Sequence, residues 1–391
     1  METCFAAAAP GLEGLAALEL RQLGLILKED SPLKKGEGSG GVEFRGELEA
    51  IYRANLHLRT ASRVLVRLGV FYAAAFSELR KKAGRLAWER FLSPGQPVSL
   101  HVTCHRSRLY HSGAVAERVG GAIGDRLGQP APLHKADSGN EEGSGAEEGE
   151  PAGPPQMVVV RLVNDECTIS IDSSGDLLHR RGYRQAVAKA PLRETLAAAM
   201  LLAAGWDPAA PLLDPFCGSG TIAIEAALLA LGLPPGCRRR FAFMDWPGYY
   251  PRRWEALLAG CRPQPASELP PILASDRDAG AVRMAQANAE RAGVAEYIQF
   301  SQRTVSAIQP PAGPGWLVTN PPYGVRASAN QDLRNLYAQL GHVLRRHCPG
   351  WQIAILCNDR KLLAQTGLRL DTSFASVNGG IPVRLGRGQV E

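Results

Sequence analysis

The feature that most restricts the fold is a regular alternation of helix-like and strand-like segments, which begins near residue 190 and ends near residue 357. The strand-like runs are APLLD, PILASD, WLVTN and WQIAILC. The helix-like runs before and between them are LRETLAAAMLLAAG, TIAIEAALLALG, AGAVRMAQANAERAGV and LRNLYAQLGHVLRRH. This order is typical of a doubly wound α/β fold with a mainly parallel sheet. Because parallel strands end at one edge of their sheet, we expect a ligand site in the segments that follow them.

Two of these strands end in an aspartate. The first runs from Asp214 into DPFCGSGT, where Gly218 and Gly220 would let the backbone approach a ligand closely. The loop is neither a dinucleotide fingerprint nor a P-loop, and a helix-capping turn without a ligand would also explain a bare GSG. The second strand ends at Asp276, whose carboxylate could accept both hydroxyls of a ribose. The spacing between the two aspartates is far longer than the ~20 residues of a compact dinucleotide unit, so it predicts an insertion, supplied by FAFMDWPGYYPRRWEALLAGC.

A third strand ends in TNPPYG, at residues 319–324. Two consecutive prolines cannot continue a strand, so the chain must turn there with a fixed backbone. The side-chain oxygen of Asn320 and the carbonyl of Pro321 could then accept the two N–H bonds of an exocyclic amine on a base, while Tyr323 stacks on its ring. An ordinary Asn-Pro turn is the alternative for NPP alone. The position after a strand, downstream of the two aspartates, favours the amine site.

The N-terminal part reads as an α/β unit of roughly 170 residues, which is long enough for two subdomains. GLEGLAALELRQLGL predicts a helix and GGVEFRG a strand, and LEAIYRANLHLRTASRVLVRLGVF predicts a helix that runs into a strand. Between VSLHVTC and the strands of QMVVVRLVNDECTISID lies a Gly/Ser/Glu/Pro segment, residues 134–155, which we expect to be a disordered surface loop within one domain.

The chain of 391 residues has a formal net charge of +6. The 134–155 segment carries a net −5, which leaves +11 on the remainder. A basic body fits a polyanionic partner, although surface charge that serves solubility alone would also explain it.

Other classes of protein find little support in the sequence. No apolar run approaches the ~20 residues that span a bilayer, and the N-terminus lacks a signal-peptide pattern, so we expect a cytoplasmic protein without membrane contact. The eight cysteines form no CxxC pair, and neither they nor the histidines have the spacing of metal ligands. We therefore expect small buried cysteines and no metal. The oligomeric state is not indicated.

DPFCGSG, the SD pair at 275–276 and NPPYG together resemble the motifs of class I S-adenosylmethionine-dependent methyltransferases that act on amino groups. The resemblance covers nearly the whole chain and is strongest to the THUMP-domain guanine-N2 RNA methyltransferases of the RlmL kind, in a form with one methyltransferase domain. The further stretches that carry it are GLEGLAALELRQLG, GGVEFRG, TISIDSSGDLLHRRGYRQAVAKAPLRETLAAAMLLAAGW, LLDPFCGSGTIAIEAA and NGGIPVRL.

The family implies three parts: a ferredoxin-like subdomain (1–55), an RNA-binding THUMP domain (56–175) and a Rossmann-like methyltransferase domain (176–391). The last would have a mainly parallel seven-stranded sheet whose final strand is antiparallel. The implied catalytic residues are Asn320, Pro321, Pro322 and Tyr323. The implied S-adenosylmethionine-binding residues are Glu194, Thr195, Asp214, Pro215, Phe216, Cys217, Gly218, Ser219, Gly220, Thr221, Asp276, Arg277, Thr304 and Asn320. Thr304 stands where relatives commonly have an aspartate that holds the adenine amine.

The resemblance implies methylation of the N2 amine of a guanine in structured RNA, with 23S rRNA as the expected substrate and tRNA as an alternative. NPPY also occurs in DNA adenine methyltransferases and in enzymes that methylate a glutamine amide of release factors, and a non-catalytic RNA-binding protein is a further alternative. The N-terminal part matches an RNA-binding arrangement, which favours RNA.

Within FMDWPGYYPRRW, a base-stacking role is conceivable for Trp246, Tyr249, Tyr250 or Trp254. We expect instead that most of these rings pack the insertion against the sheet of the methyltransferase domain, while Arg252 and Arg253 could meet phosphate.

Overall fold

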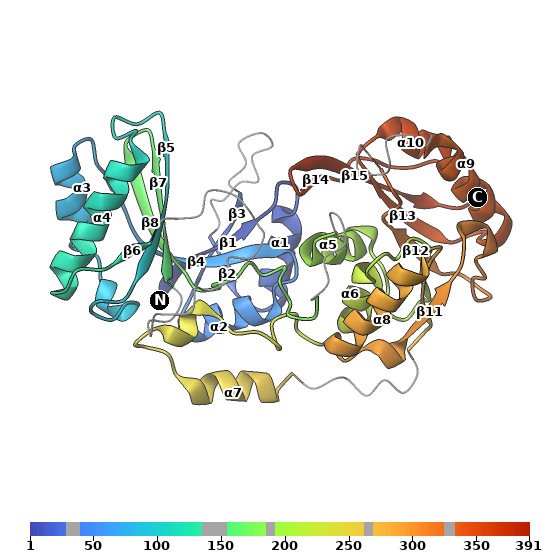
Figure 1. Ribbon diagram of the computed structural model, residues 1–391, viewed down its shortest axis with the longest axis horizontal. Helices are drawn as coiled ribbons and strands as arrows, with labels where there is room; N and C mark the ends of the chain where they lie inside the picture. Colours follow the sequence, from blue (N-terminus) through green and yellow to red (C-terminus); the bar gives the residue numbers. More distant parts are fainter. Residues whose placement is uncertain (29–39, 135–154, 185–191, 262–268, 324–332) are drawn as a thin grey trace.

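The computed structural model describes residues 1–28, 40–134, 155–184, 192–261, 269–323 and 333–391. They form an eight-stranded sheet in the N-terminal part and a seven-stranded sheet in the C-terminal part (Figure 1). Nearly all of the acidic segment that we expected to be disordered lies outside the described residues. Among the helices that are described, none combines the length and the apolar character needed to cross a bilayer.

The N-terminal sheet has the strand order β2-β3-β1-β4-β8-β7-β5-β6. Its strands are β1 (Glu2–Ala8), β2 (Ile26–Leu27), β3 (Gly41–Gly46), β4 (Ala61–Tyr72), β5 (Val98–His105), β6 (Leu133–His134), β7 (Gln156–Val163) and β8 (Glu166–Asp172). β5 pairs with β7 along its whole length. The strands on the two sides of the acidic segment therefore belong to one sheet, as predicted. The turn between β7 and β8 has positive φ at Asn164 and Asp165, the conformation of a tight hairpin turn.

Helices and strands of the N-terminal part share one hydrophobic core. The helices are α1 (Glu13–Gln22), α2 (Leu48–His57), α3 (Phe76–Ala83) and α4 (Ser112–Leu127), with a 3₁₀ turn, η1 (Trp88–Arg90). Cys4, Val66 and Ile171 are paired across β1, β4 and β8, and all three are fully buried. Because directly paired residues share a face of a sheet, this row marks the face that packs into the core.

The C-terminal sheet has the strand order β11-β10-β9-β12-β13-β15-β14. Its strands are β9 (Leu212–Asp214), β10 (Ile272–Asp276), β11 (Ile298–Gln302), β12 (Trp316–Thr319), β13 (Gln352–Cys357), β14 (Ala375–Asn378) and β15 (Ile381–Gln389). The last strand runs antiparallel to both of its neighbours, and the pairs from β11 to β13 are parallel. The predicted Rossmann-like arrangement with an antiparallel final strand is thus confirmed.

Helices cover both faces of this sheet (Figure 1). They are α5 (Glu194–Ala204), α6 (Thr221–Ala230) and α8 (Ala279–Ala292) on one face, and α9 (Leu333–His347) and α10 (Arg360–Gln365) on the other; η3 (Ala295–Tyr297) and η4 (Val305–Ala307) are short 3₁₀ turns. Adjacent residues of β9 pack on opposite faces of the sheet. Leu212 belongs to the hydrophobic core on the side of α5, α6 and α8, and Leu213 belongs to the core on the side of α9 and α10. With both faces covered, a ligand can approach the sheet only at an edge.

The predicted insertion lies between α6 and β10 and contains η2 (Ala242–Asp245) and α7 (Pro251–Ala259). Its aromatic side chains pack on the N-terminal part: the Tyr52 ring of α2 stacks on Phe243 at 4.4 Å and meets Trp254 edge-on at 6.1 Å. Trp246 is also buried, and its Nε1–H donates to Gln156 Oε1 at 3.0 Å. Trp246 and Trp254 are thus buried by packing, as expected, but they pack against the N-terminal part and not against the methyltransferase sheet. The segment after α6 leads directly to α2, where Gly236 N–H donates to the carbonyl of Leu56.

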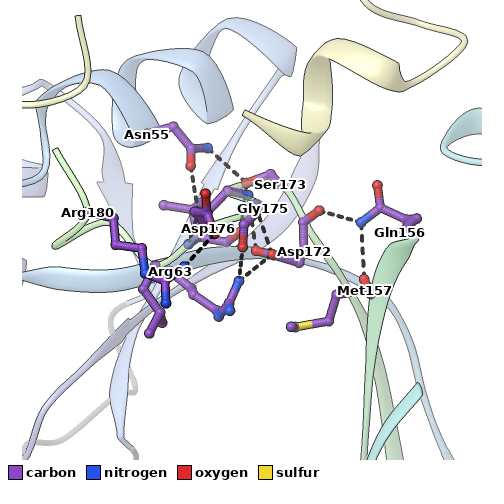
Figure 2. Close-up of polar contacts among 12 residues, drawn as sticks. Asn55, Arg63, Gln156, Met157, Asp172, Ser173, Gly175, Asp176 and Arg180 are labelled. Carbon is purple, nitrogen blue, oxygen red and sulfur yellow. Dashed lines mark hydrogen bonds and ion pairs between the residues drawn. The ribbon is translucent and has the colours of Figure 1, made fainter. Parts of the chain in front are cut away.

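The fully buried Asp172 lies at the end of β8, where the chain leaves the N-terminal sheet (Figure 2). Its Oδ2 lies 2.6 Å from Arg63 Nη1 and accepts the Gly175 N–H, and its Oδ1 accepts the Ser174 N–H. Arg239, from the segment before η2, donates to four backbone carbonyls between residues 174 and 180. Part of the basic charge predicted for nucleic-acid contact is therefore used to hold the segment that follows β8.

The cysteines behave as predicted. All eight are free, five of them are buried, and the other three are partly buried.

Candidate active site

Three polar strand ends meet at one edge of the C-terminal sheet. β10, β9 and β12 are adjacent and parallel, and they end at Asp276, Asp214 and Thr319. Asn320 follows Thr319 directly. The structure thus brings together the three sites that the sequence analysis placed after separate strands.

Asp214 is deeply buried, with about 1% of its surface exposed. Its Oδ1 accepts the Thr319 hydroxyl at 2.6 Å and the Phe216 N–H at 3.2 Å. Its Oδ2 is buried and has no hydrogen-bond partner among the described residues. Burial raises the pKa of Asp214 to about 7, against the opposing effect of the Thr319 and Phe216 hydrogen bonds, and Asp276 raises it further. An open acceptor therefore points into this part of the edge.

The glycine loop joins Asp214 to Asp276. Gly218 adopts φ 51° and donates its N–H to Asp276 Oδ2 at 3.1 Å, while Asp278 N–H donates to Asp276 Oδ1. Gly220 adopts φ 82°, and a Cβ there would lie 2.9 Å from the Cβ of Ala285. Positive φ and close packing on α8 thus explain why glycine is used at this turn. The loop and the ribose candidate form one connected unit.

Glu194 begins α5 and is almost fully buried, as is Thr195. Arg184 lies beside it, with Nε 3.4 Å from Glu194 Oε1, and its Nη2 donates to the Thr221 hydroxyl at 2.7 Å and to the carbonyl of Leu192 at 2.8 Å. Glu194 Oε2 has no partner among the described residues. Burial raises the pKa of Glu194 to about 7, although Arg184 opposes this shift.

The NPPY turn is braced from two elements. Tyr337 of α9 donates its hydroxyl to the Pro322 carbonyl at 3.3 Å, and Asn378 of β14 donates Nδ2–H to the Tyr323 hydroxyl at 3.1 Å. Asn320 Oδ1 is buried and has no partner among the described residues. A buried, unpaired amide oxygen on a braced turn is a ready acceptor for a ligand N–H.

The other predicted cofactor residues lie around this edge. Pro215, Cys217 and Ser219 are buried within the loop, whereas Arg277 and Thr304 are exposed after β10 and β11. The Thr304 hydroxyl bonds only to Ser306 among the described residues, at 3.0 Å. Gly324, the last residue of the motif, lies outside the described residues.

Four residues that support the site were not singled out from the sequence: Arg184, Thr319, Tyr337 and Asn378. Thr319 and Arg184 stand within quoted motifs, so the hydroxyl before NPPY and the arginine of the GYRQ run were signals that could have been used. Asn378 also stands in a quoted stretch, NGGIPVRL, but its contact with Tyr323, like that of Tyr337 with Pro322, joins distant segments and is revealed only by the fold. In the part of the chain that is described, no group of three or more His, Cys, Asp or Glu residues is arranged to hold a metal.

Comparison with protein families gives two matches. The RMKL-like methyltransferase domain matches residues 181–385, and the RlmL ferredoxin-like domain matches residues 3–65. The ribosomal RNA large subunit methyltransferase K/L of Syntrophotalea carbinolica is 36% identical over 97% of this chain, which spans about half (52%) of that protein's length. The protein slr0064 of Synechocystis sp., whose name assigns it provisionally to the RNA methyltransferases, is 35% identical over 97% of this chain and 95% of its own.

Among solved structures, SMU.472 in complex with SAH superposes with a TM-score of 0.84 at 28% identity, covering 100% of this chain and 98% of the other. The sheet order, the motif-bearing edge and these matches agree. The chain therefore belongs to the RMKL-like methyltransferase family.

Proposed function

We propose that the protein transfers a methyl group from S-adenosylmethionine to the exocyclic N2 amine of a guanine in structured RNA, with 23S rRNA as the substrate. The observation that carries the proposal is the buried Oδ1 of Asn320, which has no hydrogen-bond partner among the described residues and lies on a braced turn beside the glycine loop. The family match supports methyl transfer, and the name of the S. carbinolica relative supports large-subunit rRNA.

The chemistry of the edge fits the cofactor. Glu194, Asp214 and Asn320 each present one buried oxygen that lacks a partner among the described residues. S-adenosylmethionine carries an ammonium group and several hydroxyl and amine donors, which are the groups such acceptors need. SAH is bound to SMU.472, whose fold is shared over its whole length.

Within this proposal, each residue has a role set by its place. Glu194 and Thr195 close over the amino-acid end of the cofactor, the loop from Asp214 to Thr221 lines its methionine and sugar, and Asp276 accepts the ribose hydroxyls. Arg277 and Thr304 flank the adenine. When bound, the cofactor supplies a methyl group on a positively charged sulfur.

The remaining chemistry belongs to the NPPY turn. The lone pair of a guanine N2 amine is delocalised into the ring, so the amine needs acceptors that draw it toward tetrahedral geometry. Asn320 Oδ1 and the Pro321 carbonyl accept its two N–H bonds, Pro322 fixes the direction of that carbonyl, and Tyr323 stacks on the base. The nitrogen then forms the bond to the methyl carbon as the carbon–sulfur bond breaks, and one proton leaves the amine for solvent.

The N-terminal part would supply RNA contact. We propose a ferredoxin-like subdomain (1–55), a THUMP domain (56–175) and a methyltransferase domain (176–391), acting in the cytoplasm. The sheet continues from β1 through β4 to β8, so the first two parts would move as one body. Binding to phosphates should weaken steeply with salt, because counterions are released on binding.

The test is incubation of the purified protein with labelled S-adenosylmethionine and undermethylated rRNA, bulk tRNA or duplex DNA, followed by nucleoside analysis. N2-methylguanine in rRNA is the expected product, and the same nucleoside in tRNA alone would move the substrate to tRNA. N6-methyladenine as the main product, or efficient labelling of DNA alone, would overturn the proposal. RNA binding without any transfer would leave a non-catalytic RNA-binding protein.

A further inference from the structure

The insertion between α6 and β10 leaves one of its aromatic side chains well exposed. Trp246 and Trp254 are buried, and Tyr249 is partly buried. Tyr250, in contrast, is 49% exposed. α7 begins directly after Tyr250 and lies at the lower border of the molecule in Figure 1, beside α2. The packing that fixes this segment on the N-terminal part therefore leaves the Tyr250 ring accessible to a partner.

The backbone of Tyr250 is held in place by buried structure. Its N–H donates to the hydroxyl of Tyr52 at 3.0 Å, and Tyr52 is fully buried in α2. Its carbonyl accepts the N–H groups of Arg253 and Trp254 in the first turn of α7. Pro251 follows directly, and its ring restricts the backbone there. An exposed ring on such a fixed backbone loses little conformational freedom when a ligand packs on it.

Two arginines beside Tyr250 remain without an ion-pair partner among the described residues. Arg252 and Arg253 are exposed, and neither side chain makes a hydrogen bond with a described residue. The Arg253 guanidinium lies over the Tyr250 ring, 5.4 Å from its centroid. Because a cation is attracted to the face of an aromatic ring, this contact keeps the charge of Arg253 beside Tyr250.

The other described arginines of the insertion are engaged in the fold. Arg238 and Arg239 donate to backbone carbonyls. Arg240 forms a two-pronged ion pair with Asp245, at 2.7 and 2.6 Å. Within α7 itself, Glu255 is the single acid against two arginines. The surface around Tyr250 therefore carries positive charge that the described fold does not use.

An exposed aromatic ring beside unpaired guanidinium groups matches the chemistry of an unpaired nucleotide. Every base has a π-face that can stack on tyrosine, and the phosphates beside it carry the charge that arginine binds. In a duplex, neighbouring bases already cover both faces of each base. Stacking of this kind therefore needs a single-stranded segment, a bulge or an end.

We propose that Tyr250, Arg252 and Arg253 form a platform for single-stranded RNA, in which a base stacks on the Tyr250 ring and the adjoining phosphates contact the two arginines. This inference rests on the proposed function, because the strand that it binds belongs to the RNA substrate. The platform lies in the insertion, outside the sheet edge that carries Asn320. It therefore contributes to capture of the substrate and takes no part in methyl transfer.

The experiment measures binding of the full chain to two labelled RNAs by fluorescence anisotropy. One is an oligoadenylate of about 12 nucleotides, and the other is the duplex that it forms with oligouridylate. Tyr250→Leu removes the ring and keeps an apolar side chain. It should weaken binding of the single strand at least about fivefold, the effect of losing one stacked base, and change duplex binding less than about twofold. Tyr250→Phe retains the ring and is the matched control, with both affinities unchanged.

A second pair of variants tests the charge. Arg253→Gln and Arg240→Gln each remove one positive charge from the insertion, but Arg240 is already paired with Asp245. Arg253→Gln should weaken binding of the single strand several-fold, and Arg240→Gln should leave it nearly unchanged. In methylation assays with undermethylated rRNA, Tyr250→Leu should raise KM for the RNA and leave kcat unchanged, because the platform binds the substrate without touching the reacting amine.

Equal weakening of single-strand and duplex binding by Tyr250→Leu would show a loss that does not depend on stacking, and it would overturn the platform. Unchanged binding of the single strand would overturn it as well. If Tyr250→Leu does not fold, the comparison of Arg253→Gln with Arg240→Gln decides, and equal affinities of these two variants would refute the platform. Binding of undermethylated rRNA without any binding of the oligoadenylate would refute the platform alone, whereas failure of the unaltered protein to bind either would refute the RNA substrate of the proposed function.

Discussion

Asp172 and Asp214 are both fully buried aspartates at the end of a strand, yet their surroundings differ. Asp172, at the junction of the two parts, faces the Arg63 guanidinium and accepts two backbone N–H bonds, so both of its oxygens are used. Asp214, at the sheet edge, accepts from two neutral donors and keeps one oxygen open. A buried carboxylate whose two oxygens both have hydrogen-bond donors stabilises the fold. A buried carboxylate with one oxygen lacking a donor marks a place where a ligand can supply the missing donor.

Removal of Asp172 should have the largest effect. Asp172→Ala leaves the partly buried Arg63 without its carboxylate partner and frees two backbone N–H groups, so we expect a loss of about 3–5 kcal/mol in the free energy of unfolding. Urea denaturation measures it. Asp125→Ala, at an exposed ion pair with Arg80, is the control and should cost less than about 1 kcal/mol. Equal losses in the free energy of unfolding of the two variants would contradict the proposed difference between the buried Asp172 and the exposed Asp125.

At the sheet edge, the expected effect falls on the reaction. Asn320→Ala should lower the methylation rate at least about a hundredfold, the order seen when one positioned hydrogen-bond partner of a transition state is removed. RNA affinity should change little, since the amide acts on the reacting amine. The exposed Asn358 provides a control, and Asn358→Ala should retain full activity. A rate that survives within a few-fold would exclude the amine-acceptor role.

Asp276→Ala should weaken S-adenosylmethionine binding about tenfold or more, because a charged acceptor for the ribose is worth roughly 1.5–3 kcal/mol. Calorimetry provides the affinity. Asp278→Ala, two residues away, is a matched control: it removes the N-cap of α8, where Asp278 accepts the Gly280 N–H, and should cost stability rather than affinity. If affinity falls equally in both variants, the ribose assignment fails.

The smallest expected effect is the pH dependence of stability in the ligand-free protein. Burial raises the pKa of Asp214 to about 7, above its value in the unfolded chain. Between the two pKa values the unfolded chain binds fewer protons at this group, so its contribution to stability falls as pH rises from about 4 to 7. Asp214→Asn removes that dependence. The variant should therefore gain about 1–2 kcal/mol relative to the unaltered protein between pH 6 and pH 8, measured by urea denaturation at each pH. If the difference in the free energy of unfolding between the two proteins does not change with pH, the pKa of Asp214 is not raised by folding.

The C-terminal part could be predicted well because each of its elements is local. Apolar periodicity identifies its helices and strands, and a parallel order forces the strand ends to one edge. β1 could not be predicted: its ETCFAAA sequence lacks strand-forming character, and it is held in the sheet by pairing with β3 and β4. The packing of the insertion on α2 could not be predicted either, because it depends on where the end of α6 points.

The sequence by itself determined the doubly wound core, the motif-bearing edge and the types of residue that end its strands. Those features follow from periodicity, turn residues and spacing, which act over a few residues. Only the tertiary structure decided which acceptors are left open, because hydrogen-bond partners come from distant segments: Thr319 for Asp214, and Arg63 for Asp172. The tertiary structure also decided that arginines such as Arg239 bind backbone carbonyls of the segment after β8. Composition fixes the net charge of the chain, but burial decides which charged side chains remain available to a partner.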